Sequence, residues 1–380
     1  MLGLLPSFDF PVSSSSFFVR IIHLDTGKEL RGGQRQLLSL SRGLRARGHE
    51  QLIVCPEGSG LESTAWEEGF RVFALPNHDL GRAHGIMQLR QRLLAEPAQI
   101  LHAHDGRGQT LSWLASMGLP VRRIASRRVT FLPETVARHR FIYTRTCDSV
   151  IAVSHYVRSL LITAGVAGER IDVIPDGIEI PDELPTPAER AAARADWGFG
   201  EQEFILGHVG AFTPEKGQDV AIAALRLLVE KLPSARLLLV GTAPRDSVAK
   251  LSEQPGNVPG RVMFLGELED LAAFFAGIDL FIMPSRAEGL GSAGLLAMAR
   301  GRAVVASRVG GLPEIVEPGR SGWLVEPGSP QALADAIVAA ASDGARLGQF
   351  GHYARERARQ FSNDIMVAKT EALYQRLLTC

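Results

Sequence analysis

Short apolar runs alternate with longer amphipathic stretches along most of this chain. In the first half, six runs have the length and the β-branched or leucine-rich composition of strands: FFVRIIHL, EQLIVCP, RVFALP, QILHAHD, VRRIASR and DSVIAVS. Polar or helical sequence follows each of them. Strands that alternate with helices are typical of a parallel sheet with helices on its faces. The first half therefore predicts a doubly wound α/β domain.

A second set of strands follows the stretch PDGIEIPDELPTPAERAA, whose four prolines and several acids interrupt both periodicities and indicate a linker. The expected strands of this set are FILGHVGAF, ARLLLVG, VMFLG, LFIMPS, AVVASRVG and GWLVEPG, with helical patterns such as GQDVAIAALRLLVEKLP between them. The predicted fold class is therefore α/β, with two Rossmann-like doubly wound parallel-sheet domains facing a cleft. Ligands of such sheets bind beyond the carboxyl ends of the strands.

Length and composition agree with two domains in a reducing compartment. A chain of 380 residues with 46% hydrophobic residues exceeds what one core usually fills. The cysteines Cys55, Cys147 and Cys380 show neither a paired framework nor metal-ligand spacing, so we expect no metal site. No apolar run reaches the roughly 18 to 20 residues of a membrane span, and the start lacks the positive region of a signal peptide. These features predict a cytoplasmic protein.

The net charge of zero conceals an asymmetry between the halves. Residues 1–150 hold 19 Lys and Arg against 13 Asp and Glu, whereas residues 151–380 hold 22 against 28. A basic half suits an anionic membrane surface or an anionic substrate, or it is only a solvated face. The excess is modest and lacks interleaved aromatic residues, which disfavours nucleic acid. The candidate contacts to an anionic surface are Arg42, Arg45, Arg47, Arg122, Arg123, Arg127 and Arg128.

Two turns of the first domain carry candidate chemistry. Gly32 and Gly33 follow the first strand and precede an amphipathic helix, where backbone N–H groups and the helix N-terminus suit a phosphate. The segment HAHDGRG places His102, His104 and Asp105 at the end of a strand. Each feature alone is also compatible with an ordinary turn or a structural histidine.

Two turns of the second domain have the same character. In GHVGAFTPEKGQD, Lys216 stands before a helix, where its charge adds to the helix dipole and suits a diphosphate. In PSRAEGLGSAG, Glu288 lies among glycines; the carboxylate suits two sugar hydroxyls, and the glycines let amides approach a phosphate. Because these turns are expected to meet at one cleft, together they indicate a binding site.

The motifs VGAFTPEKG, LFIMPSRAEGLGSAGLLAMARG, AVVASRVGGLPEIVEPGRSGWLVEPGSPQALADAI and VIPDGIEI resemble the retaining glycosyltransferases of family 4, the group 1 glycosyltransferases, which have the GT-B fold. The resemblance covers about residues 18–375. It implies a UDP-, GDP- or ADP-sugar donor on the second domain, a glycan or lipid-linked acceptor on the first, and transfer with retention and without a metal or other cofactor. It also suggests synthesis of cell-surface polysaccharide or lipopolysaccharide, peripherally on the inner face of the cytoplasmic membrane.

The expected domains are an extension at 1–17, an acceptor domain at 18–178, a nucleotide-sugar domain at 179–360 and a helix at 361–380 that packs back on the first domain. By the resemblance, Glu288 contacts the donor sugar's hydroxyls and Lys216 binds the diphosphate and stabilises the leaving charge. His104 lines the transfer site. The other expected donor contacts are Gly33, Gly210, Leu290, Gly291, Ser292 and the position of Leu296, and the expected acceptor contacts are Arg127 and Arg128.

Two positions depart from the family pattern. Ala211 stands where an arginine usually precedes the lysine by five residues, and Leu296 stands where a second acid usually binds the nucleotide ribose. A degenerate protein that binds a nucleotide or glycan without turnover is therefore the alternative to an active transferase. Two further enzyme classes were weighed: phosphorylases need a cofactor lysine in a longer chain, and epimerases need carboxylate pairs in the cleft that this sequence does not offer.

Overall fold

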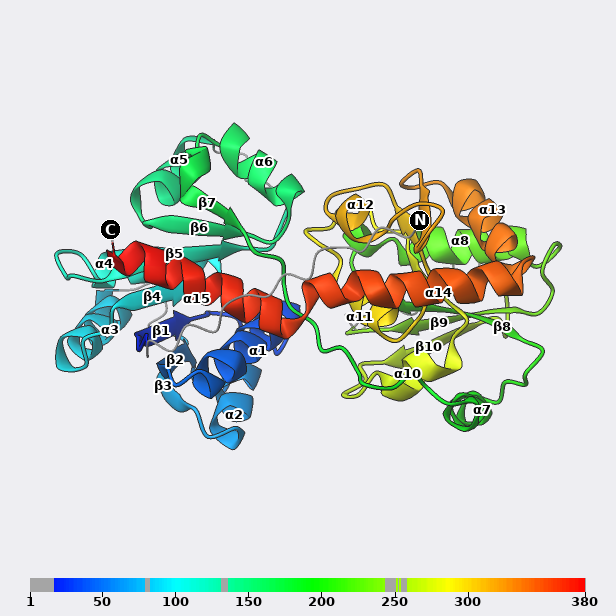
Figure 1. The fold of residues 1–380 in the computed structure, drawn as a ribbon, viewed down its shortest axis with the longest axis horizontal. Coiled ribbons are helices and arrows are strands. Elements are labelled where there is room, and N and C mark those ends of the chain that lie inside the picture. The colour runs from blue at the N-terminus through cyan, green and yellow to red at the C-terminus, as the bar shows by residue number, and fades with distance from the viewer. Residues whose placement is uncertain are drawn as a thin grey trace, which may run out of the picture.

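Two parallel sheets, each flanked by helices, form the protein in the computed structural model (Figure 1), which describes residues 17–78, 83–130, 136–242, 251, 253 and 258–379. The predicted fold class is thereby confirmed. The expected extension at 1–17 lies outside the described residues except for Phe17.

The first sheet has seven strands in the order β3-β2-β1-β4-β5-β6-β7, and all of its pairs are parallel. Six of the strands fall within the predicted runs. The seventh was not predicted, because a run of three residues just before a proline is too short to show a period. The strands are β1 (Arg20–Leu24), β2 (Glu50–Pro56), β3 (Arg71–Leu75), β4 (Ile100–Ala103), β5 (Arg122–Arg127), β6 (Ser149–Ala152) and β7 (Ile171–Val173).

Helices cover both faces of this sheet, which explains why most residues of its central strands are buried. Ile21 and Ile100 pack with Leu40 of α1 on one face, while Leu24 and Leu101 pack against α3 and α4 on the other. Each such side chain contributes about 1.5–3 kcal/mol by leaving water. The helices are α1 (Gly32–Ala46), α2 (Gly60–Glu67), α3 (Ala83–Ala95), α4 (Gly106–Ala115), α5 (Val136–Arg145) and α6 (His155–Thr163), with a 3-10 turn at Gly168–Arg170.

The second sheet has six parallel strands in the order β10-β9-β8-β11-β12-β13. The strands are β8 (Phe204–Val209), β9 (Ala235–Val240), β10 (Val262–Gly266), β11 (Leu280–Met283), β12 (Val304–Ser307) and β13 (Gly322–Val325). The described helices around it are α8 (Gln218–Leu228), α10 (Ala272–Gly277), α11 (Ser292–Ala299), α12 (Leu312–Ile315), α13 (Pro330–Ala341) and α14 (Gly344–Ala358), with 3-10 turns at Pro214–Lys216 and Arg359–Phe361.

Part of the expected linker is helical. Helix α7 (Pro187–Asp196) begins inside it, because Thr186 and Glu189 form a capping box and Pro187 occupies the first turn, where its missing N–H costs nothing. Arg194 then ties this helix to the second domain through a 2.5 Å ion pair with Asp279. Pro187, one of the four prolines that indicated a linker, is therefore also the first residue of a helix.

The chain returns to the first domain in its last helix, α15 (Asn363–Thr379), which lies across the first sheet (Figure 1). Val367 and Tyr374 of α15 are buried in the core that Ile21 and Leu40 also share. The two crossings between domains are hydrogen-bonded to each other: Ile178 N–H donates to the Phe361 carbonyl at 2.9 Å, and Asn363 N–H donates to the Ile178 carbonyl at 3.0 Å.

Both sheets reverse their strand order at one place. The reversal lies between β1 and β4 in the first sheet and between β8 and β11 in the second. Loops that leave adjacent strands in opposite directions open a crevice at the carboxyl edge, which is where ligands of such sheets bind. The loops after these four strands therefore define where to look for a site.

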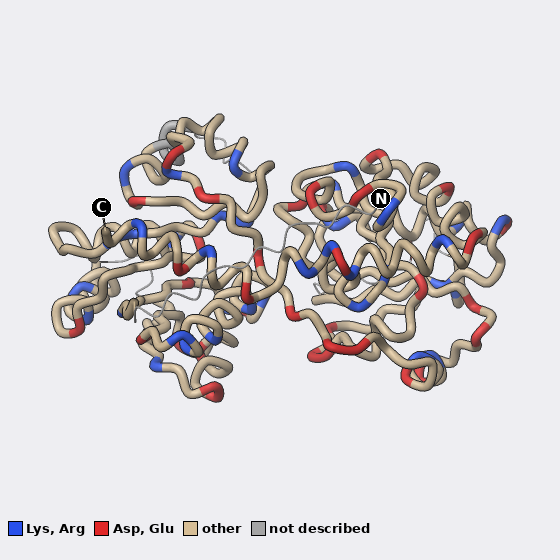
Figure 2. The backbone as a smooth tube through the Cα atoms, in the orientation of Figure 1, with Lys and Arg blue, Asp and Glu red and all other residues tan. Residues whose placement is uncertain are grey.

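Lys and Arg are interspersed with Asp and Glu over both domains (Figure 2). Six of the seven arginines expected to meet an anionic surface have protein partners: Arg42 and Arg45 contact Glu68, Arg47 contacts Glu371, Arg123 contacts Asp148, Arg127 contacts Tyr143 and Arg128 contacts Asp176. Most of these charges thus serve contacts within the fold. Among the described helices, none has both the length and the apolar character that crossing a bilayer requires.

Candidate functional site

Lys216 and Glu288 meet at the carboxyl edge of the second sheet. Lys216 ends the 3-10 turn after β8, and Glu288 lies in the loop after β11, so the two side chains come from both strands of the reversal. Lys216 Nζ lies 2.6 Å from Glu288 Oε2, with 29% of the lysine side chain and 12% of the glutamate side chain exposed. A cation and a carboxylate thus share one partly buried place.

The two loops that carry this pair are fastened to each other. Arg286 N–H donates to the Glu215 carbonyl at 2.7 Å, and the Arg286 guanidinium forms an ion pair with Asp219 at 2.6 Å. Both contacts join the β11 loop to the start of α8. The relative position of Lys216 and Glu288 is therefore set by several bonds rather than by their own contact alone.

Four of the other expected donor contacts follow Glu288 in the chain, in the loop and helix after β11. Gly291, with φ of 102°, is the N-cap of α11, and Ser292 is the first residue of that helix, while Leu290 is buried. The N-cap of α11 forms no side-chain hydrogen bond, and the first N–H groups of the helix are the positive end of its dipole. Leu296 lies one turn further on, packed against the core. It offers no hydrogen-bond acceptor.

Across the cleft, His104 follows β4 and joins a chain of buried hydrogen bonds. Arg128 Nη1 lies 3.4 Å from His104 Nδ1, His104 Nε2 lies 3.1 Å from His23 Nδ1, and His23 Nε2 lies 3.1 Å from the side-chain oxygen Oε1 of Gln51. Arginine only donates and the amide oxygen only accepts, so the protons sit on Nε2 of both histidines. The acceptor nitrogen of His104 is thereby directed toward Arg128.

Burial keeps these histidines uncharged. Loss of hydration is the largest cause of the low pKa of His104, well below 6.5, and the neighbouring His102 and Arg128 add to it. The pKa of His23 is lowered to about 4 by the same burial. At neutral pH, His104 is therefore uncharged, and its two ring nitrogens are engaged by Arg128 and His23.

His23, His102 and His104 bring their ring nitrogens within 4.8 Å of one another, which raises the question of a metal ion. His102 Nδ1 pairs with the Tyr374 hydroxyl at 2.7 Å, and its Nε2 pairs with the Ser126 hydroxyl at 2.8 Å. The bonds of His23 and His104 occupy their remaining nitrogens. The cluster is accounted for by hydrogen bonding alone.

Arg127 and Arg128, both expected acceptor contacts, point in different directions. Arg127 is turned into the first domain, where Nη1 donates to the Tyr143 hydroxyl at 2.9 Å. Arg128 lies beside His104 and pairs with Asp176 at 2.8 Å. Of the two, only Arg128 contacts His104, the residue expected to line the transfer site. Gly33 lies within the first turn of α1, so the two glycines begin that helix rather than precede it.

Contacts between the domains bring the loop that carries Glu288 close to the residues around His104. The Ser154 hydroxyl donates to the Gly289 carbonyl at 2.7 Å. A Cβ on Gly289 would stand 2.1 Å from the Arg128 carbonyl oxygen, so only glycine permits this approach. Since Gly289 follows Glu288 directly and Arg128 touches His104, the groups expected to bind donor and acceptor flank one interface.

A second contact between the domains joins α6 of the first domain to Glu314 of the second. The Glu314 carboxylate of the second domain accepts from the backbone N–H groups of His155 and Tyr156 of α6, both at 2.8 Å. These belong to the first helical turn, whose N–H groups have no partner within the helix. A carboxylate from one domain thus caps a helix of the other.

Sequence reasoning missed several of these residues. Asp25 follows β1 directly and is buried; burial is the main cause of its raised pKa, followed by the nearby Asp105. The sequence could have indicated Asp25, because a carboxylate immediately after a buried parallel strand lies at the edge of the sheet where ligands bind. Asp176 lay inside the quoted motif VIPDGIEI without an assigned role. Nothing local marked Ser154 or Glu314, whose partners are in the other domain.

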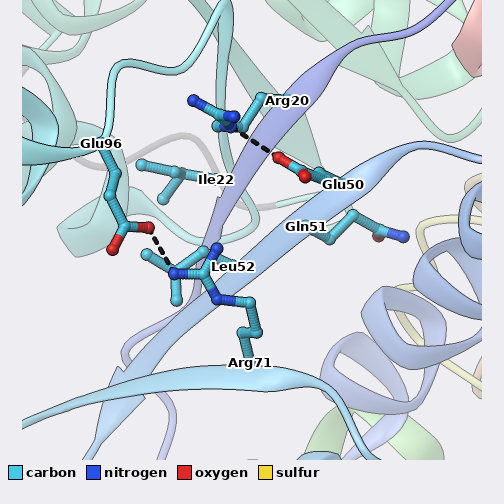
Figure 3. A pocket seen from close by; sticks show the side chains of 7 residues that line it. All are labelled: Arg20, Ile22, Glu50, Gln51, Leu52, Arg71 and Glu96. Atoms are coloured by element: carbon cyan, nitrogen blue, oxygen red, sulfur yellow. Dashed lines mark hydrogen bonds and ion pairs between the residues drawn. The ribbon is translucent and has the colours of Figure 1, made fainter.

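A small hollow on the first domain is not part of this site. Arg20, Ile22, Glu50, Gln51, Leu52, Arg71 and Glu96 line it, and two ion pairs cross it (Figure 3). Arg20, Glu50 and Arg71 are the first residues of β1, β2 and β3, so the hollow lies at the amino edge of the sheet. Ligands of such folds bind at the opposite edge.

Comparison with known proteins agrees with the geometry. The family model "Glycosyl transferases group 1" matches residues 203–343, and "Glycosyltransferase Family 4" matches residues 30–180. A GDP-mannose-dependent alpha-(1-6)-phosphatidylinositol monomannoside mannosyltransferase of Mycobacterium tuberculosis is 30% identical over 353 residues, covering 86% of this chain and 90% of the relative. An N-acetyl-alpha-D-glucosaminyl L-malate synthase of Bacillus anthracis is 28% identical over 319 residues, covering 81% and 82%.

Solved structures share the fold over nearly the whole chain. Anabaena HepE in complex with UDP and glucose superposes with a TM-score of 0.84 at 24% identity, covering 95% of this chain and 100% of HepE. WaaG, a glycosyltransferase involved in lipopolysaccharide biosynthesis, has a TM-score of 0.73 at 19% identity, covering 94% and 99%. With two facing doubly wound domains and these relatives, the chain belongs to glycosyltransferase family 4, the group 1 glycosyltransferases, and has the GT-B fold.

Proposed function

We propose that this chain transfers a glycosyl group from a UDP-, GDP- or ADP-sugar to a glycan or lipid-linked acceptor with retention of the anomeric configuration. The bond between sugar C1 and the diphosphate oxygen breaks, the acceptor hydroxyl oxygen bonds to C1, and its proton passes to the departing diphosphate. No group in this scheme requires a metal or other cofactor.

The observation that carries the proposal is the Lys216–Glu288 pair at 2.6 Å, on the strand reversal of the second domain and opposite His104 and Arg128. Lys216 and the first amides of α11 would stabilise charge on the leaving diphosphate. Glu288 would accept hydrogen bonds from the donor sugar, and neutral His104 would line the transfer site. The UDP and UDP-glucose complexes of HepE support a nucleotide-sugar donor.

A donor screen tests the proposal. We would titrate UDP, GDP and ADP and their sugars into the protein by calorimetry and then follow slow hydrolysis of each bound sugar nucleotide without acceptor. We expect one nucleotide to bind preferentially and its sugar to be hydrolysed slowly. Failure of all three nucleotides to bind would contradict the proposal.

A non-catalytic binding protein remains the second candidate, and Leu296 favours it because the leucine cannot accept a hydrogen bond from the ribose. The two candidates differ in turnover. A protein that binds a sugar nucleotide at micromolar concentration, yet neither hydrolyses it nor transfers its sugar to any of a panel of glycans, would support the second.

We further propose that the acceptor is lipid-linked or of the lipopolysaccharide type and that the protein works peripherally on the inner face of the cytoplasmic membrane. The lipid named for the mycobacterial relative and the pathway named for WaaG support this. Sedimentation with phosphatidylglycerol vesicles should exceed that with phosphatidylcholine vesicles and should fall with salt, since exposed charges are screened over about 8–10 Å. Equal sedimentation would remove the electrostatic part of the proposal.

A further inference from the structure

His208 lies below the donor site and has no role in the function proposed above. It is the second-last residue of β8 and is 1% exposed. Its Nδ1 lies 3.0 Å from the carbonyl oxygen of Ile282 on the neighbouring strand β11. A carbonyl oxygen only accepts, so the proton of the neutral ring is on Nδ1 and Nε2 is an acceptor.

Two effects keep this ring neutral. Burial is the larger, and it lowers the pKa of His208 to about 4, although the Ile282 carbonyl opposes it; the positive charge of Lys216 lowers the pKa further. A neutral ring next to the lysine therefore presents a lone pair rather than a second positive charge.

The Nε2 atom of His208 has no hydrogen-bond partner among the described residues, although it is buried. A buried polar atom without a partner costs free energy, and native structures contain few of them. The strand would have accommodated a leucine or valine at this position without that cost, as it does at Leu206. An unpaired acceptor here therefore needs a partner in some state of the protein.

The Lys216 side chain lies close to His208 and could supply a proton donor. A Cβ placed on Gly210 would lie 3.3 Å from His208 Nε2 and 3.4 Å from both Cγ and Cδ of Lys216. The histidine acceptor and the lysine stem therefore border the same small space above Gly210. Rotation about the terminal bonds of Lys216 redirects its ammonium group without moving Cδ.

If the proposed function holds, the Lys216 ammonium changes its hydrogen-bond partner when a donor binds. In the structure, Lys216 Nζ donates to Glu288 Oε2, but Glu288 would be needed by the hydroxyls of the donor sugar. An ammonium has three N–H donors, and a diphosphate does not occupy all of them from one side. The remaining one needs an acceptor on the protein side.

We propose that His208 is a positioning residue of the donor site, whose Nε2 accepts a hydrogen bond from the Lys216 ammonium in the donor-bound state and so directs that ammonium toward the diphosphate. Lys216 thus exchanges Glu288 for His208 as its protein partner when Glu288 turns to the sugar.

The test measures nucleotide affinity by calorimetry. UDP and GDP are the diphosphate ligands, and UMP and GMP are the matched ligands that lack the second phosphate. The variants are His208→Leu, His208→Met, His208→Gln, Lys216→Ala and the double variant His208→Leu with Lys216→Ala. Gln places an amide oxygen near the position of Nε2 and restores an acceptor. Leu237→Val, in the same core but on β9, controls for a mild loss of stability.

We expect both apolar variants to bind the preferred diphosphate about tenfold more weakly, as for loss of a bond to a charged group. They should bind the monophosphate normally, and His208→Gln should recover most of the affinity. The double variant should bind no more weakly than Lys216→Ala, because the histidine acts through the lysine. Thermal unfolding of each variant, compared with Leu237→Val, identifies any that is not folded, and the other apolar variant then carries the comparison.

Three results would overturn the inference: unchanged diphosphate affinity in the apolar variants, equal losses for diphosphate and monophosphate, or additive losses in the double variant. Absence of nucleotide binding by the wild-type protein would instead refute the proposed function. The two failures are therefore distinguishable.

Discussion

Lys216 and Glu288 are 72 positions apart in the chain and share one hydrogen bond. Each residue alone is unremarkable: lysines near helix starts and acids in glycine-rich turns are common on protein surfaces. What sets them apart is their proximity, since the charge of each is compensated by the other. In the proposed function, a ligand with both a diphosphate and hydroxyls would separate them. We therefore expect activity to be most sensitive to substitution of these two residues.

Replacing Lys216 or Glu288 by Ala should each lower turnover of the preferred sugar nucleotide by about 10²-fold or more, the scale of losing one donor to a developing charge. Lys231→Ala is the control, because Lys231 forms an exposed pair with Asp335 at 3.2 Å, away from the site. Initial rates at saturating donor provide the measurement. Near wild-type rates in both variants would remove these residues from the site.

Because leucine replaces an acid at position 296, we expect the protein to discriminate weakly between a nucleotide with a ribose and its 2′-deoxy analogue. A bond from a ribose hydroxyl to a carboxylate is worth about 1.5–3 kcal/mol, so its absence weakens nucleotide binding by roughly ten- to a hundredfold. We expect the preferred nucleoside diphosphate and its 2′-deoxy analogue to bind the wild-type protein about equally. Leu296→Glu should prefer the ribose form. A wild-type preference above tenfold, measured by calorimetry, would show that another group has taken over this role.

At the scale of elements, β1, β4 and β8 each end with buried histidines. His23, His102 and His208 point from these strands into cores where leucine or valine would also fit, and His104 follows β4. Hydrogen bonds satisfy His23 and His104 only in their neutral form, because each of these rings donates from Nε2 and accepts at Nδ1. Protonation of these rings is therefore expected to destabilise the folded protein.

Stability should accordingly fall with acidification. The folded pKa values of His23 and His208 are lowered to about 4, from 6.5, so the unfolded chain binds more protons between these values. Stability from this source is full above pH 6.5 and declines toward pH 4, by at most about 1.4 kcal/mol per pH unit for each histidine.

Urea unfolding between pH 7.5 and 5 measures this slope. His23→Gln should reduce it, whereas His352→Gln, at an exposed position of α14, should leave it unchanged. A midpoint that stays constant over this range would contradict the role assigned to the buried rings.

At the scale of the whole molecule, the two domains are held together by the paired crossings at Ile178 and Asn363 and by the contacts near the site. The Glu314 carboxylate stands out, because it satisfies two N–H groups of α6 and complements the positive end of that helix dipole. The contact requires the domain arrangement seen in the structure, because Glu314 and α6 belong to different domains.

Glu314→Ala should therefore shift the protein toward more open arrangements and raise the KM for donor more than it lowers kcat. Small-angle scattering should give a larger radius of gyration than for the wild type. Glu317→Ala is the matched control, since Glu317 pairs with Arg320 and Arg357 within its own domain. Identical scattering of wild type and Glu314→Ala would mean that this cap does not hold the closed form.

The sequence by itself determined the class of fold and most of the elements. A buried strand such as Glu50–Pro56 and an amphipathic helix such as Gln218–Leu228 carry their period in a few consecutive residues, so they are visible without tertiary context. It also identified Lys216 and Glu288 as candidates, because residue type and a strand-to-helix turn are local properties.

Only the tertiary structure decided which of these residues meet. The direction of Arg127 into the core, the partners of most basic residues, the cap by Glu314 and the unpaired nitrogen of His208 all depend on groups distant in the chain. The order of strands in a sheet brings such groups together, and that order follows from the packing of all the elements. A local pattern contains the period of an element but not the identity of its neighbours.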